Sequence, residues 1–158
     1  MDDDKGVGGA VEKGFSTDLV TDKAIRWIKE RDRTKPFSVF CHFKATHEPC
    51  DFPERFAHLY DGVRFPEPEN LLEFGPAKSG RTFAGQPLET MAWRWNKAYT
   101  DPENWWTYYP ELPFCGVEGD SVANRRAIYQ KLVRDYPRCA AAIDDNIGRL
   151  LRTLDEEG

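Results

Sequence analysis

Hydrophobic positions near the N-terminal end recur with the period of a helix. Apolar side chains follow one another at spacings of four, one and three residues: Val20, Ala24, Ile25 and Ile28. Charged side chains fill most of the positions between them, which predicts an amphipathic helix over about residues 17–31. Ser16 and Thr17 stand at its start, so one of these hydroxyl groups is expected to cap the helix N-terminus.

The next apolar run, residues 37–43, lacks a helical period. Nearly every position in it is apolar, which is typical of a strand buried on both faces of a parallel sheet. A helix followed by such a strand forms half of an α/β layer unit. No second run of comparable quality follows, so the neighbouring strands are expected outside this chain or poorly encoded within it. We therefore expect an α/β fold with one buried strand and flanking helices.

Residues 46–119 form a long region that is rich in proline and aromatic residues and has no clear period. An irregular segment of this length inside a compact domain is commonly functional. A short helix near residues 54–60 is expected after Pro53, which suits the first turn of a helix. Trp105 and Trp106 are candidate substrate-binding residues, because rigid aromatic rings stack well on sugars. A satellite core beneath a long loop is the structural alternative for these rings.

Helical periodicity returns at Asp120 or Ser121 and continues to the end of the chain. Two apolar stripes define it: Ile128, Leu132, Val133 and Tyr136, then Ile143, Ile147, Leu150, Leu151 and Leu154. Pro137 falls between the stripes and removes a backbone donor, so a kink or break is expected there.

Composition limits the classes of function. The chain has 158 residues, with 22 Lys and Arg against 27 Asp and Glu and a net charge of −5. This length suits one domain or a piece of one, and the scattered basic residues do not indicate a nucleic-acid partner. No apolar window is long enough to predict a membrane span.

Residues 1–14 are acidic and then Gly-rich, so we interpret them as disordered or vector-derived and not as a signal peptide. Neither compartment nor oligomeric state can be read from the chain.

Cysteines and paired carboxylates do not predict a metal site. Four cysteines, Cys41, Cys50, Cys115 and Cys139, show neither metal-ligand spacing nor a disulfide framework. Cys41 lies in the apolar run and is expected to be a buried free thiol. Asp144 and Asp145 are adjacent on a predicted helix and point in different directions, so a solvated or capping role is expected.

The stretch His42-Phe43-Lys44-Ala45-Thr46-His47-Glu48-Pro49 holds the candidate chemistry. It begins in the predicted strand and becomes a loop at a proline. Ligands of open parallel sheets bind beyond the carboxyl ends of the strands. Lys44 offers a point charge and His47 a proton donor near neutral pH, which suits an anionic substrate. A surface lysine and a surface histidine are the alternative reading. His42 is expected in the core and His58 on the exposed face of the short helix.

Residues 15–158 resemble the central part of the type I sulfatases, members of the alkaline phosphatase superfamily. The resemblance rests on the Lys-Ala-x-His-x-Pro turn after an apolar run and on the Asp-Asp-Asn-Ile-Gly helix near the C-terminus. It implies a partial alkaline-phosphatase-like fold. It also implies that His47 protonates the leaving oxygen of a sulfate ester and that Lys44 contacts the substrate. Residues 15–158 would then be the central part of a catalytic domain.

The cofactors of that family have no matching motif here. Family members use calcium and a formylglycine, which is made from Cys or Ser in a Cys/Ser-x-Pro-x-Arg motif. No cysteine in this chain begins such a motif, and the Ser-Asp-x-Gly calcium motif is also missing. We therefore expect no cofactor in this chain, calcium and formylglycine in the intact enzyme, and no activity of the chain alone. Family members are often periplasmic or secreted.

Several functional readings remain open. The leading one is a segment of a sulfuric ester hydrolase that acts on a sulfated small molecule or glycan. The alternatives are a phosphomonoester or phosphonate hydrolase of the same superfamily, a non-catalytic carbohydrate-binding fragment, and a remnant without independent function. The remnant reading predicts marginal stability, with residues 37–43 as an aggregation hazard.

Overall fold

The computed structural model describes residues 12–73, 87–100 and 114–158, without the side chains of residues 98–100. This part of the chain is helical and contains no β-strand. Its elements, in chain order, are α1 (Ser16–Glu30), the 3-10 helices η1 (Glu54–Phe56) and η2 (Glu69–Leu72), α3 (Thr90–Thr100) and α4 (Ser121–Glu157).

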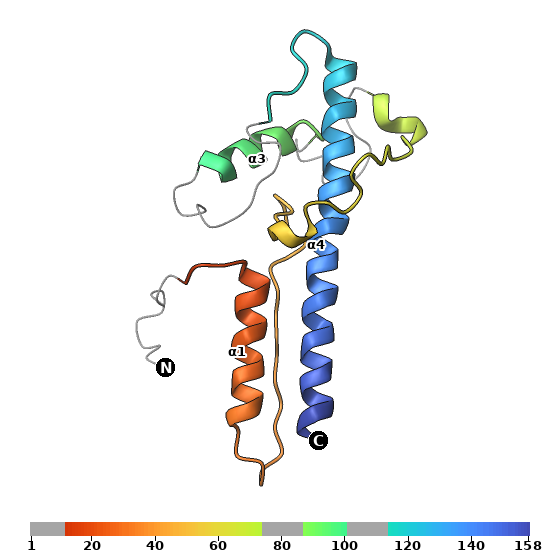
Figure 1. Cartoon of the computed structure of the whole chain (residues 1–158). Coiled ribbons are helices and arrows are strands. Elements are labelled where there is room, and N and C mark those ends of the chain that lie inside the picture. The colour runs from red at the N-terminus through yellow and green to blue at the C-terminus, as the bar shows by residue number, and fades with distance from the viewer. Residues whose placement is uncertain (1–11, 74–86, 101–113) are drawn as a thin grey trace.

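Helix α1 lies beside the C-terminal half of α4 (Figure 1). The predicted helix is confirmed to within one residue at each end. The predicted hydroxyl cap is wrong, because Phe15 occupies the N-cap position and no side chain caps the helix. Thr17 is instead buried together with Thr21 and Ile28, so the hydroxyl that could have capped the helix faces the interior. Burial of this face fixes α1 against α4.

Helix α4 is the longest element, with 37 residues and a length of about 55 Å. Its predicted start is confirmed, since the Oδ1 atom of Asp120 accepts a hydrogen bond from the backbone N–H of Ala123 at 2.9 Å. Of the kink or break predicted at Pro137, the break does not occur, because the helix continues through this residue. Tertiary contacts hold the turn that follows: the buried Arg138 donates to the carbonyl of Leu59 at 2.8 Å. Such contacts offset the one helical hydrogen bond that proline cannot make.

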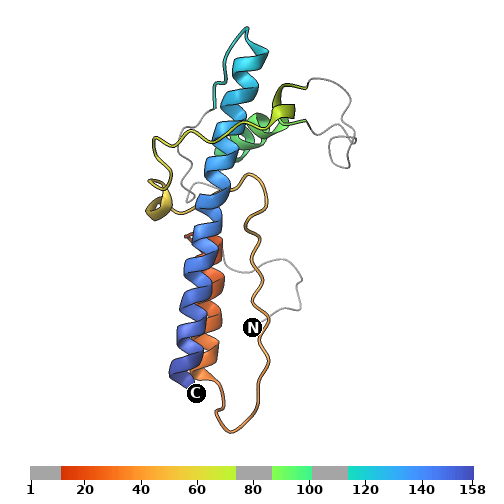
Figure 2. The same ribbon diagram turned by 90° about the vertical axis from the view of Figure 1, so that its right-hand side faces the viewer.

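Residues 37–43 run extended but unpaired, so the predicted strand buried on both faces is wrong. Phe40 is 84% exposed, and His42, expected in the core, is also exposed. Cys41 is half-buried rather than buried. A strand requires a hydrogen-bonded neighbour, and the described residues contain no second strand. Figure 2 shows the segment on one side of the α1 and α4 pair.

The predicted irregular region, residues 46–119, contains more helix than expected. The short helix predicted after Pro53 forms as the 3-10 helix η1, followed by turns. Helix α3 falls in the same region and was not predicted. Trp105 and Trp106 lie outside the described residues.

The core is small and gathers around α4. Phe52 and Ala57, from the chain before and after η1, pack with Cys139 of α4, and Ala45 covers this cluster. Charged groups are buried on the same helix, where Lys131 and Asp135 form an ion pair of 2.7 Å. Among the described elements, every pair whose backbones lie close together includes α4.

Candidate functional site

The turn that carries Lys44 and His47 follows the extended segment directly. The backbone N–H of His47 donates to the carbonyl of Lys44 at 3.0 Å, and the N–H of Cys50 donates to the carbonyl of His47 at 3.0 Å. Both the Ala45–Thr46 and the Glu48–Pro49 peptide bonds are cis. Two consecutive turns therefore hold His47 at the tip of the loop, where its side chain is 53% exposed.

The imidazole of His47 is oriented by the backbone of the next residue, Glu48. Its Nδ1 atom lies 2.8 Å from the carbonyl oxygen of Glu48 and 3.5 Å from the Oε2 atom of the Glu48 carboxylate. Because a carbonyl oxygen only accepts, the hydrogen bond places a proton on Nδ1. The Nε2 atom has no hydrogen-bond partner in the described part of the chain. This nitrogen can therefore exchange a proton with a ligand.

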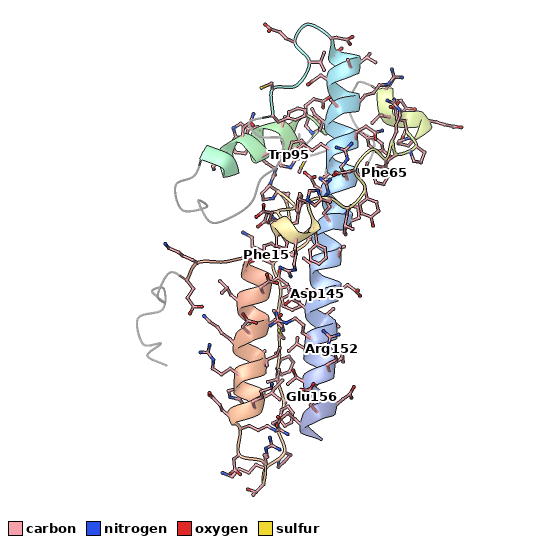
Figure 3. All side chains as sticks on the ribbon, viewed as in Figure 1. Phe15, Phe65, Trp95, Asp145, Arg152 and Glu156 are labelled. Atoms are coloured by element: carbon pink, nitrogen blue, oxygen red, sulfur yellow. The ribbon has the colours of Figure 1, made fainter. Side chains whose placement is uncertain are left out.

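Two residues of α3 fasten this turn. Arg94 donates to the Oε1 atom of Glu48 at 2.6 Å, and both side chains are largely buried. The indole N–H of Trp95 donates to the carbonyl of Pro49 at 3.0 Å. Trp95 is 1% exposed and lies where α3 meets α4 (Figure 3). Helix α3 thus fixes both residues that follow His47.

Sequence reasoning missed this fastening. Glu48 and Arg94 are separated by 46 residues along the chain, as are Pro49 and Trp95. Neither pair produces a periodic signal. The one signal in the sequence is that the two pairs, Glu48 with Arg94 and Pro49 with Trp95, have the same separation. This signal is too weak to predict a contact.

Lys44 is exposed on the same turn and influences a nearby carboxyl group. Burial raises the pKa of Asp51 above its ordinary value, and the positive charge of Lys44 offsets part of this shift. Lys44 is therefore close enough to Asp51 for an electrostatic interaction. The turn presents one cation and one imidazole to solvent.

Buried thiols near the turn are poor nucleophiles. Burial and, to a smaller extent, nearby carboxylates raise the pKa of Cys50 to about 11. Burial also raises the pKa of Cys139 to about 12. Thiols are nucleophilic only as thiolates, so both groups are inert at neutral pH.

The residues present do not fit calcium or a formylglycine. The described residues contain no group of three or more His, Cys, Asp or Glu side chains that could hold a metal ion. Asp144 is exposed, whereas Asp145 accepts a hydrogen bond from Arg55 at 3.1 Å, so these adjacent carboxylates do not share a site. None of the cysteines begins a Cys-x-Pro-x-Arg motif.

The remaining histidines do not join the turn. The side chain of His58 is 91% exposed, as predicted, and its Nδ1 atom lies 3.4 Å from the Oδ2 atom of Asp61. The ring of His42 lies 6.2 Å from the ring of Phe40, between centroids, on the exposed extended segment. Of the candidate residues named from the sequence, the structure places Lys44 and His47 together and describes neither Trp105 nor Trp106.

Comparison with known proteins identifies the family. The family described as Sulfatase matches residues 2–158. The chain belongs to the sulfatase family. An N-acetylglucosamine-6-O-sulfatase from Bacteroides thetaiotaomicron is 31% identical over 175 residues, which cover 94% of this sulfatase chain and 31% of the relative. The predicted resemblance to type I sulfatases is confirmed.

A solved structure supports the same assignment. It is described as a complex with its substrate D-glucosamine-2-N,6-O-disulfate, and it matches with a TM-score of 0.70 and 28% sequence identity. The match covers 93% of this sulfatase chain and 35% of the solved chain. The sulfatase chain thus spans about a third of the length of the relatives it matches. No helix among the described residues is both long and apolar enough to cross a membrane.

Proposed function

We propose that this chain supplies a proton donor, His47, and an anion contact, Lys44, to a sulfuric ester hydrolase that acts on sulfated carbohydrates. Residues 15–158 would form the central part of its catalytic domain. The observation that supports this role is the orientation of His47: Nδ1 binds the carbonyl of Glu48, and the half-exposed ring leaves Nε2 available to a ligand.

Both side chains suit the cleavage of a sulfate ester. When the S–O bond breaks, negative charge develops on the leaving oxygen, and a sugar alkoxide is a poor leaving group without a proton. A doubly protonated His47 can deliver this proton from Nε2 while Nδ1 keeps its hydrogen bond. General acid catalysis of this kind accelerates reactions by about 10²–10⁴-fold. The Lys44 ammonium can bind the sulfuryl oxygens through its hydrogen-bond donors.

The similar proteins support a carbohydrate as the substrate. One relative is named for the removal of a 6-O-sulfate from N-acetylglucosamine, and the solved structure holds a glucosamine that carries a 6-O-sulfate. We infer that a hexosamine with a sulfate ester is the substrate class. The two similar proteins therefore favour a sulfate ester as the substrate over the phosphate or phosphonate ester of the alternative hypothesis.

The chain alone is expected to be inactive. Its described residues do not form a metal site, and its sequence contains no formylglycine motif. His47 can donate a proton only where another group attacks sulfur. Purified chain should therefore release no sulfate from 4-nitrophenyl sulfate or from N-acetylglucosamine 6-sulfate, as measured by ion chromatography.

The role of His47 can be tested in a graft. Residues 15–158 would replace the matching third of the Bacteroides thetaiotaomicron relative, which supplies the other segments. We expect His47→Gln to lower kcat/KM for N-acetylglucosamine 6-sulfate by about 10²–10⁴-fold. The loss should be much smaller for 4-nitrophenyl sulfate, because 4-nitrophenolate leaves readily without a proton.

The matched control is His58→Gln, because His58 is also an exposed histidine. It should leave kcat/KM unchanged for both substrates. Equal losses for the two substrates after His47→Gln would contradict the proton-donor role. Faster turnover of 4-nitrophenyl phosphate than of 4-nitrophenyl sulfate would instead favour the phosphomonoester hydrolase.

A further inference from the structure

Glu48 links the imidazole of His47 to helix α3 through both of its carboxylate oxygens. Its Oε2 atom lies 3.5 Å from Nδ1 of His47, and its Oε1 atom accepts a hydrogen bond from Arg94 at 2.6 Å. Its backbone carbonyl oxygen lies 2.8 Å from the same Nδ1 atom. We propose that Glu48 is a positioning residue: Arg94 holds it in place, and it keeps Nδ1 of His47 protonated and Nε2 available to the substrate. This inference rests on the proposed function of His47.

The part of α3 that holds Glu48 is itself anchored. Trp95 is 1% exposed, and its indole N–H donates to the carbonyl of Pro49 at 3.0 Å. Asn96 binds the backbone of Phe114 twice, accepting from its N–H at 2.7 Å and donating to its carbonyl at 3.0 Å. Arg94 directly precedes these two residues, so its guanidinium extends from a segment of the helix that is fixed on two sides.

The ring of His47 needs such a support because it lies at the tip of a turn and is half-exposed. A half-turn of the imidazole exchanges the positions of Nδ1 and a ring carbon, and only the nitrogen can donate to a carbonyl oxygen. The carbonyl and the carboxylate of Glu48 both face Nδ1. Two acceptors from one residue therefore favour one orientation of the ring and one tautomer.

This orientation matters for proton transfer from Nε2. A misplacement of about 1 Å in a reacting group can lower a rate by about 100-fold. Without the Glu48 side chain, the ring of His47 would turn more freely, and Nε2 would face the leaving oxygen for a smaller fraction of the time. The loss should be large only where the leaving oxygen needs a proton. A purely structural role would lower the rate for every substrate alike.

A second glutamate bound by arginine provides a matched control. The side chain of Glu67 is 21% exposed, compared with 13% for Glu48. It accepts hydrogen bonds from Arg126 at 2.9 Å and from Arg64 at 2.7 Å. All three residues lie outside the His47 turn. Glu67→Ala therefore removes a comparable ion pair without changing the contacts of the imidazole.

The first test is NMR of the ring nitrogens in the chain with isotope-labelled histidine, at about pH 9, where imidazole side chains are neutral. We expect the Nδ1–H form of His47 to predominate and Glu48→Ala to shift the population toward the Nε2–H form. Arg94→Met should cause a smaller shift in the same direction, and Arg94→Lys should restore most of the original population. After Glu48→Ala, Arg94→Met should add nothing, because Arg94 acts through Glu48.

The second test is kinetic and uses the graft described above. Glu48→Ala should lower kcat/KM for N-acetylglucosamine 6-sulfate by about tenfold to 100-fold and change it little for 4-nitrophenyl sulfate. Glu67→Ala should leave the tautomer and both rates unchanged, and circular dichroism should show equal helix content in all variants. Equal losses for the two substrates, an unchanged tautomer after Glu48→Ala, or the same shift after Glu67→Ala would overturn the positioning role.

The two readouts distinguish this inference from the proposed function. If His47→Gln causes the selective loss but Glu48→Ala leaves the tautomer unchanged, His47 remains the proton donor and Glu48 does not position it. If Glu48→Ala shifts the tautomer but His47→Gln causes no selective loss, Glu48 still orients the ring and the proton-donor role fails.

Discussion

Arg55 binds both carboxylate oxygens of Asp18, with Nη1 to Oδ2 and Nη2 to Oδ1 distances of 2.7 Å each. The same guanidinium reaches Asp145 at 3.1 Å, and Asn146 donates to Asp18 at 2.7 Å. Together these four side chains join η1, which follows the His47 turn, to both α1 and α4. A bidentate hydrogen-bonded pair of arginine and carboxylate is among the strongest contacts between side chains.

The Asp18 contact makes stability depend on pH. Burial alone would raise the pKa of Asp18, but hydrogen bonds from Arg55 and Asn146 outweigh it and hold the pKa below its ordinary value of 3.8. A carboxyl group whose pKa is lower in the folded state stabilises the fold above its unfolded pKa. This contribution is lost as the pH falls from 3.8 through the folded value.

We expect Asp18→Asn to lower the free energy of unfolding by about 1 kcal/mol at pH 7, after allowance for the partly exposed Arg55. The difference from the unmodified chain should shrink as the pH falls below 3.8. Urea unfolding followed by circular dichroism measures the free energy of unfolding of each variant at both pH values. Asp155→Asn, at an exposed position of α4, should have no effect at either pH. A pH-independent difference for Asp18→Asn would contradict the assignment.

The cysteines should react with a thiol reagent in order of exposure and thiolate content. Cys115 is exposed and should react first, followed by the half-buried Cys41, whose pKa is raised by burial. Cys50 and Cys139 are buried, with pKa values raised to about 11 and about 12, so they remain protonated at pH 8. We expect them to react only as the chain unfolds. Mass spectrometry of labelled peptides gives the order, and early labelling of Cys139 would contradict it.

Pro137 should reduce the stability of α4 although it does not break the helix. Pro137→Ala restores the N–H that can bind the carbonyl of Val133 and removes the clash of the proline ring. Greater freedom of the unfolded chain opposes this gain, so we expect a net stabilisation of about 1–2 kcal/mol. The reverse change, Ala141→Pro, should destabilise the chain by about 3 kcal/mol. Thermal unfolding compares the two variants, and a lower Tm for Pro137→Ala would refute the expectation.

The unpaired segment should drive self-association. Phe40 is 84% exposed within residues 37–43, whose extended backbone has no strand partner among the described residues. Exposed apolar strands pair with other copies, and a charged residue discourages this. We expect Phe40→Lys to increase the monomer fraction in size-exclusion chromatography with light scattering.

The control for this change is Phe52→Lys, which places a charge at a core position that is only 2% exposed. It should unfold the chain, because a buried charge without a partner is costly. If Phe40→Lys leaves the monomer fraction unchanged, exposure of this segment is not the cause of association.

Local patterns predicted α1 and α4 because their periods are visible in short windows. The strand over residues 37–43 was predicted from its composition, but a strand forms only with a neighbour, which no local pattern supplies. Thr17 shows a similar limit: its hydroxyl suits a cap, yet packing against α4 buries it. Tertiary contact overrides local preference in both cases.

The candidate site was predicted only in part. The position of His47 after an apolar run and before a proline made it a candidate, with a surface histidine as the alternative, and the family resemblance supplied its expected role. The residues that orient and fasten it, Glu48, Arg94 and Trp95, depend on contacts across 46 residues. Such contacts leave only a weak signal in residue spacing, so the structure is needed to show them.

Helix α4 divides the molecule into halves with different partners. Before Pro137, its residues bind residues 65–67 and helix α3. After Pro137, they bind α1, the core residues around η1 and the carbonyl of Leu59. Arg55 of η1 binds both Asp18 of α1 and Asp145 of α4, so η1, α1 and the C-terminal half of α4 should open together, whereas the N-terminal half with α3 can open while they stay intact. Amide hydrogen exchange along α4 should therefore show two protection levels that change near Pro137.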